Sequence, residues 1–168
     1  PEIFFCVYPP AKKESSVHTT VGIATLWAAA LASSRTLRRW SLDRYGKAVA
    51  LRVGVDMRRP PDESDAPFIA LFPDAVATGP GRKANEHEVG LLIGLSEEGF
   101  ENREGVMLMT GMLRLAEVWE LVRKTVEQAV PGVSLGDVSA EYHLAGYPLV
   151  MLDATLTTTE SLPVGRRL

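Results

Sequence analysis

The chain has 168 residues, 46% of them hydrophobic and 23% charged, so it can form one domain with a real hydrophobic core. Its net charge of −3 provides no bulk attraction to anions, so we expect no specific nucleic acid and no membrane as a partner. The single cysteine, Cys6, excludes an intramolecular disulfide and a cysteine-based zinc cluster and suits a reducing cytoplasm. The apolar run at residues 3–8 is far shorter than the ~20 residues that cross a bilayer, so we expect neither a transmembrane span nor a signal peptide.

The first 17 residues are interpreted as an N-terminal arm. Residues 3–8 are apolar and favour an extended strand, which Pro9 and Pro10 end. Such an arm either crosses to a neighbouring subunit or adds a strand to its own sheet, and the sequence favours neither. We expect residues 18–158 to form a single domain and residues 159–168 to form a flexible C-terminal tail.

A helix is predicted from residue 20 to about residue 42, with Thr19 or Thr20 as its cap. Two consecutive serines, at 33 and 34, mark a candidate break in it. Three arginines near its end suit the negative end of the helix dipole and are interpreted as a solvated face rather than a nucleic-acid patch: Arg35, Arg38 and Arg39.

Three strands and two long loops are predicted next. Alternating or continuous apolar residues indicate strands at 48–56, 68–72 and 87–95, the second ending at Pro73. The alternation predicts a sheet that buries one face only. The loops at 57–67 and 74–85 carry exposed basic residues, which are our candidate assembly contacts: Arg58, Arg59, Arg82 and Lys83.

The second half of the chain predicts an acidic loop at 97–105, a long helix at 109–130 and two closing strands, at 138–143 and 147–157. The helix carries one apolar stripe, formed by Leu115, Val118, Val122, Val126 and Ala129. The fold class is therefore α+β, a mixed and largely antiparallel sheet with two main helices in the order α-β-β-β-α-β-β.

No set of residues predicts catalysis, a metal or a cofactor. The segment at 79–83 is glycine-rich, but Lys83 is followed by a strand rather than by Ser or Thr opening a helix, as a phosphate loop requires. Glu141 and His143 share a strand face and form at most half of a zinc site. A small enzyme that uses these two residues remains an alternative.

The order of elements resembles the tail-terminator, or tail-completion, proteins of long-tailed phages, including those of Mu-like prophages. The resemblance covers roughly residues 18–158 and rests on the strands at 49–56, 67–73 and 86–95 and on the final hairpin at Tyr147-Pro148. It implies a non-enzymatic subunit that forms a ring, commonly a hexamer, and caps the tail tube. The implied partners are copies of itself and the tail-tube protein, and the implied location is the bacterial cytoplasm during assembly and then the virion tail. A head–tail connector or neck protein is the other structural alternative.

Overall fold

A computed structural model describes residues 18–56 and 58–161 of the chain. The predicted arm at residues 1–17 and the last part of the predicted tail lie outside the described residues. The elements in chain order are α1 (Thr20–Ser33), α2 (Arg35–Tyr45), β1 (Ala50–Val53), the 3-10 turn η1 (Glu63–Asp65), β2 (Phe68–Ala77), β3 (Ala84–Ser96), β4 (Phe100–Arg103), β5 (Val106–Met109), α3 (Thr110–Glu127), β6 (Val133–His143) and β7 (Leu149–Ser161).

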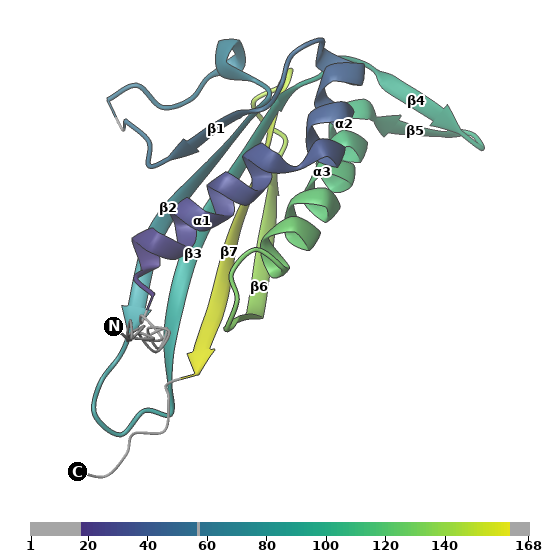
Figure 1. Cartoon of the computed structure of the whole chain (residues 1–168). Coiled ribbons are helices and arrows are strands. Elements are labelled where there is room, and N and C mark those ends of the chain that lie inside the picture. The colour runs from purple at the N-terminus through teal and green to yellow at the C-terminus, as the bar shows by residue number, and fades with distance from the viewer. Residues whose placement is uncertain (1–17, 57, 162–168) are drawn as a thin grey trace, which may run out of the picture.

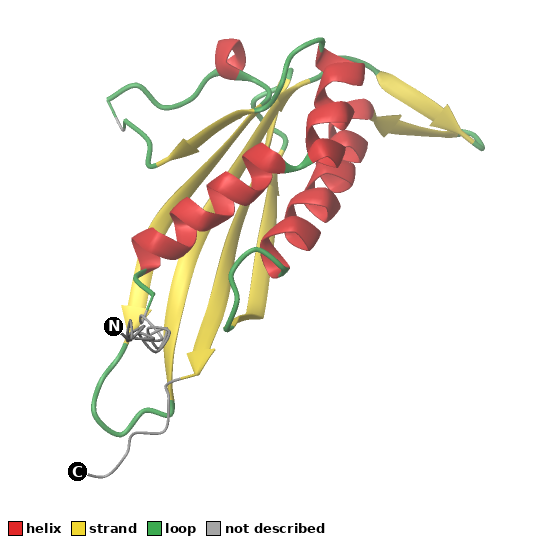
Figure 2. Cartoon of the chain, in the orientation of Figure 1, coloured by secondary structure: helices red, strands yellow, loops and turns green. Residues whose placement is uncertain are grey.

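Five of the strands form one mixed sheet in the order β1-β2-β3-β7-β6, and β4 and β5 form a separate hairpin (Figure 1). Only the β1–β2 pair is parallel, and the other three pairs are antiparallel. The three helices lie on one face of this sheet, and the β4–β5 hairpin projects from one end of it (Figure 2). The predicted α+β class with a mixed, largely antiparallel sheet is confirmed.

The core lies between the helices and one sheet face. Alternate residues of β3 and β7 point into it, and their apolar side chains pack against α1 and against the stripe of α3. The fully buried residues include Trp27, Leu91, Leu115, Val122 and Leu152. The stripe predicted for α3 is therefore the buried face of that helix.

The opposite sheet face is mostly polar, as the alternation predicts, but it is covered at the β1–β2 end. There η1 lies against β3, and Arg52 of β1 forms an ion pair with Asp65 of η1. Phe68 and Ala70 on this face are fully buried. The ring of Phe68 fills the space that the missing side chain of Gly94 leaves on β3.

The first predicted helix is two helices, with the break at the serine pair. Ser34 caps α2 by accepting a hydrogen bond from the backbone N–H of Leu37 at 3.3 Å. Gly46 ends α2 in the left-handed conformation, at a φ of 65°. Glu117 of α3 then ties α2 to α3, because it accepts from Trp40 Nε1 at 3.2 Å and pairs with Arg44 at 3.0 Å.

Several boundaries differ from those predicted, and β6 for example begins at Val133 rather than at Val138. β1 is only four residues long and is followed by Gly54 at a φ of 83°. β2 continues past Pro73 to Ala77 and stays paired with β3, because a bulge between Pro73 and Ala75 absorbs the irregularity and no described strand needs the missing Pro73 N–H on the other edge of β2. The β2–β3 connection is consequently 78–83 rather than 74–85. β7 extends beyond Thr157 to Ser161 and pairs with β3 along its whole length.

The predicted acidic loop at 97–105 is instead the first strand and the turn of a β-hairpin, which is the largest departure from the sequence-based expectation. β4 and β5 pair with a two-residue turn at Glu104 and Gly105, both at positive φ, 53° and 85°. Two positive values in a two-residue turn are typical of type I′ hairpins. The side chain of Asn102 accepts from the Gly105 N–H at 3.0 Å and stabilises the turn.

Candidate assembly surfaces

The β4–β5 hairpin is an exposed apolar projection. It extends beyond α3, away from the main sheet (Figure 1). Phe100, Val106 and Met107 keep 54%, 57% and 60% of their surface exposed. The strand pairing places Phe100 and Met107 on one face of the hairpin and Val106 on the other, so the hairpin exposes large apolar side chains on both faces and is our first candidate contact in the described residues.

The base of the hairpin is held in a fixed direction. Arg114 of α3 lies 3.5 Å from Glu101 of β4 and 2.8 Å from Glu117. The backbone N–H of Gly99 donates to the Tyr147 hydroxyl at 3.0 Å, and that of Thr110 donates to the Gly99 carbonyl at 3.1 Å. These contacts fix the hairpin to the body, so its apolar side chains are presented in a defined orientation.

The four basic residues predicted from the sequence lie in two separate connections. Arg58 and Arg59 lie between β1 and β2, and Arg82 and Lys83 lie between β2 and β3, at the far end of the sheet (Figure 1). All four are exposed. Arg58 pairs with Asp56 at 2.9 Å, and the hydrogen bonds from Arg58 hold the pKa of the Asp56 carboxyl below its usual value. Arg82 pairs with Glu86 at 3.0 Å. The structure therefore does not bring the two pairs together into one patch.

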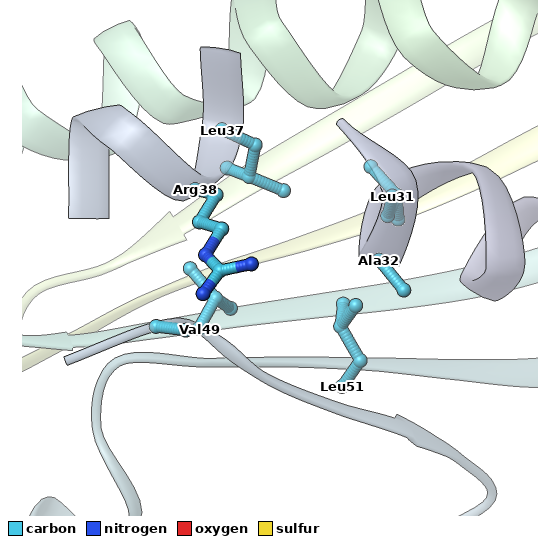
Figure 3. A pocket seen from close by; sticks show the side chains of 7 residues that line it. Leu31, Ala32, Leu37, Arg38, Val49 and Leu51 are labelled. Atoms are coloured by element: carbon cyan, nitrogen blue, oxygen red, sulfur yellow. The ribbon is translucent and has the colours of Figure 1, made fainter. Parts of the chain in front are cut away.

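Two surface pockets, both formed by described residues, are not lined by side chains that could act together in catalysis. One of about 180 Å³ lies between the α1–α2 junction and β1, and Arg38 is the only ionisable side chain lining it (Figure 3). Glu141 and Asp153 face each other across β6 and β7 and border a second, but no His, Cys or third carboxylate lines it. Among the described residues, no group of three His, Cys, Asp or Glu side chains is placed to hold a metal ion. The glycine-rich segment at 79–83 connects two antiparallel strands, with no helix after it.

A buried polar cluster closes the end of the sheet that lies opposite the hairpin. Glu160 of β7 accepts from the His18 ring at 2.6 Å and from the His18 backbone N–H at 3.1 Å. His87 of β3 is 1% exposed, and its Nδ1 lies 2.9 Å from the Thr20 hydroxyl. Its other nitrogen, Nε2, has no hydrogen-bond partner among the described residues and lies 3.9 Å from Glu160. The cluster joins the two ends of the described chain.

Burial in this cluster lowers the pKa of His87, although the nearby Glu160 carboxylate acts in the opposite direction. For Glu160, burial alone would raise the pKa, but the hydrogen bonds from His18 outweigh burial and leave that pKa lowered. The folded state therefore favours a neutral imidazole at His87 and a charged carboxylate at Glu160.

This difference predicts a pH dependence of stability. Because His87 binds a proton less readily in the folded than in the unfolded chain, acidification below the ordinary histidine pKa of ~6.5 favours unfolding. We expect the melting temperature to fall from about pH 7.5 to about pH 5.5, and to fall less in His87→Asn, whose amide can still bond to Thr20. The contribution of Glu160 is lost only at lower pH, because its carboxyl stays charged in this window. Equal slopes for the two proteins in thermal melts would contradict the prediction.

Comparisons with known proteins assign no family. No family model matches the chain, and no curated protein matches it. Among solved structures, a chain described as "Virion of native gene transfer agent (GTA) particle" is 12% identical, with a TM-score of 0.47. The match covers 81% of this chain and 92% of that chain. At this identity and TM-score, the likeness carries no argument about function. None of the described helices has both the length and the apolar character needed to cross a membrane.

Proposed function

We propose that this protein is a non-enzymatic structural subunit of a phage or prophage, and that it completes the tail as a ring. The observation that carries the proposal is the β4–β5 hairpin, which holds Phe100, Val106 and Met107 out in solvent on a fixed base. A heterologous contact made by such a projection closes into a ring when the rotation between subunits allows it. The resemblance in element order to tail-terminator proteins supports the same function.

Within this proposal the partners are copies of the same chain, in a ring of the hexameric size that the resemblance implies, and the tail-tube protein. Assembly takes place in the bacterial cytoplasm, and the finished ring lies at the end of the virion tail. Arg58, Arg59, Arg82 and Lys83 are proposed as further contacts, because each is an exposed cation in a chain with net negative charge.

The experiment measures the oligomeric state by size-exclusion chromatography with light scattering over a range of protein concentrations. We expect the wild type to assemble as its concentration rises. The variant Val106→Thr/Met107→Gln should need about tenfold more protein to assemble, because burying less apolar surface at the contact weakens it by ~1.4 kcal/mol or more. The matched control is Leu26→Gln, which removes an exposed apolar side chain from α1 and should assemble as the wild type does.

A second arm of the experiment tests the charged connections. Arg82→Glu/Lys83→Glu is compared with Arg39→Glu/Lys47→Glu, a matched pair of exposed cations elsewhere. The first variant should lose assembly most visibly at low salt, where screening is weak. Cosedimentation with purified tail tubes separates a tail terminator from a connector. A wild type that stays monomeric at high concentration and remains in the supernatant when the tail tubes sediment would rule the proposal out.

A further inference from the structure

β6 is an open edge of the sheet. Among the described strands it pairs only with β7, and it is 11 residues long. Its register shifts between Leu135 and Val138, after which residues 138–143 pair regularly with β7. Natural proteins usually shorten, charge or cover such an edge, because its free N–H and C=O groups can pair with another strand.

The helix-facing side of this edge is apolar and uncovered. Val138 and Tyr142 are exposed to 37% and 42%, and Ala140 between them is also exposed. These three side chains point to the same face as the core, since they lie opposite Leu156, Ala154 and Leu152 of β7. Where β6 ends, an apolar groove of about 420 Å³ opens between it and α3, lined by Met112, Leu113, Ala116, Tyr142 and Leu144. An open backbone edge beside an apolar groove is the combination that binds an extended apolar segment by strand addition.

We propose that residues 3–8 of the same chain add as a sixth strand to the outer edge of β6. This segment has the sequence Ile-Phe-Phe-Cys-Val-Tyr, which combines high strand propensity with apolar side chains in both alternating positions. It is six residues long, the same length as the regular part of β6. The proposal is independent of the proposed function, because it concerns how one subunit completes its own sheet.

The anchored position of His18 puts this segment within reach. The backbone N–H of His18 bonds to Glu160, and Glu160 lies directly opposite Val133, the first residue of β6. The new strand would lie two strand spacings, ~10 Å, from β7. Its end at residue 8 would lie ~17 Å along β6 from Val133, the residue opposite Glu160. The connection at 9–17 spans up to ~30 Å when extended, so nine residues suffice.

The same position sets the direction and the register. Because the connection arrives at the start of β6, residues 3–8 run antiparallel to it. When the two six-residue runs are aligned end to end, Phe4 lies opposite Tyr142, Cys6 opposite Ala140 and Tyr8 opposite Val138. Phe4 then fills the groove beside α3, as an aromatic cross-strand pair with Tyr142. A neighbour's segment could add at the same edge, but tethering raises the effective concentration of the chain's own segment there.

The outer edge of β2 beyond Leu71, which β1 leaves unpaired, is one competing site, and it suits an added strand poorly. There Pro73 has no N–H to donate and Asp74 is exposed.

Cys6, the only cysteine, makes a direct test possible in the full-length protein. Single cysteines are introduced by Ser139→Cys, Ala140→Cys and Glu141→Cys, three exposed positions of β6, and by Ala75→Cys on β2 as the matched control. Each variant is incubated with oxidised glutathione and run on a non-reducing gel. We expect an intrachain disulfide in Ala140→Cys, because a disulfide requires Cβ atoms ~4 Å apart. An intrachain bond only at position 139 or 141 would keep strand addition to β6 but overturn the proposed register, because a shift of one residue turns Phe4 to the opposite face of the sheet, away from the groove. A bond only in Ala75→Cys, an interchain dimer, or no bond at any position would overturn the proposal.

Hydrogen exchange gives a second measure that needs no cross-link. Amides of residues 138–143 should exchange about tenfold more slowly in the wild type than in Phe4→Asp/Phe5→Asp. Amides of α3 serve as the internal control and should exchange equally in both. Equal exchange along β6 in the two proteins would overturn the proposal as well.

Discussion

Val122→Asp should strongly destabilise the folded protein and reduce its soluble yield. Val122 is fully buried in the α3 stripe, packed in the core between helices and sheet. A carboxylate there has no described cation to pair with inside the core, and burying it or opening the core costs ~4 kcal/mol or more. Because domains of this size are stable by only about 5–15 kcal/mol, a loss of that size removes a large part of the stability and should lower the melting temperature by roughly 10 °C or more.

The measurement is a thermal melt by circular dichroism, together with the soluble yield. Lys124→Asp is the control, because it places the same carboxylate at an exposed position of the same helix. The control should melt within a few degrees of the wild type. A soluble Val122→Asp protein with an unchanged melting temperature would show that α3 does not pack as described.

Gly94→Ala should destabilise the protein strongly, although it adds only one methyl group. A Cβ built on Gly94 would lie 2.2 Å from two carbons of the Phe68 ring, and Phe68 is fully buried and cannot swing away. We expect a loss of about 3 kcal/mol, the upper range for overpacking a core. Combining Gly94→Ala with Phe68→Leu should cost less than the sum of the two single changes, because the smaller side chain makes room.

Gly90→Ala provides the matched control on the same strand and face. There a Cβ would lie 2.8 Å from the ring of Phe72, which is only partly buried and has solvent to move into. Its loss in urea titrations should therefore be the smaller of the two. The reverse order would show that the Phe68–Gly94 contact is not the tight one.

Local periodicity predicted the helices and strands in which burial follows a regular pattern along the chain. The 3.6-residue stripe of α3 and the alternation of β3 report burial on one face, and the structure places both as expected. The serine pair also marked the α1–α2 break correctly. These features needed no knowledge of distant residues.

The hairpin and the end of β7 were missed for physical reasons. The turn at Glu104-Gly105 lacks the Asn-Gly or Asp-Gly signal of most type I′ turns, and the apolar run at 106–109 was the only other clue. In β7, Thr158 and Glu160 look solvated in the sequence. They are buried because His18 and His87, far away in the chain, provide their hydrogen-bond partners. No local pattern contains such long-range contacts.

The same limit applies to the candidate surfaces. Arg58 and Arg82 were predicted to be exposed, which holds, but their pairing with Asp56 and Glu86 reduces the charge available to a partner. The exposed apolar side chains of the hairpin became visible only once β4 and β5 were paired.

The pairing of β3 with β7 sets the order of events when the chain is made. β4, β5, α3 and β6 all lie between these two strands in the sequence, yet β3 and β7 pair along 84–96 and 149–161 at the centre of the sheet. Loops of this length are closed late, and folds rich in such contacts fold slowly. On the ribosome, β3 cannot complete its pairing with β7 until Ser161 has left the exit tunnel, so this edge of β3 stays open to chaperones in the meantime.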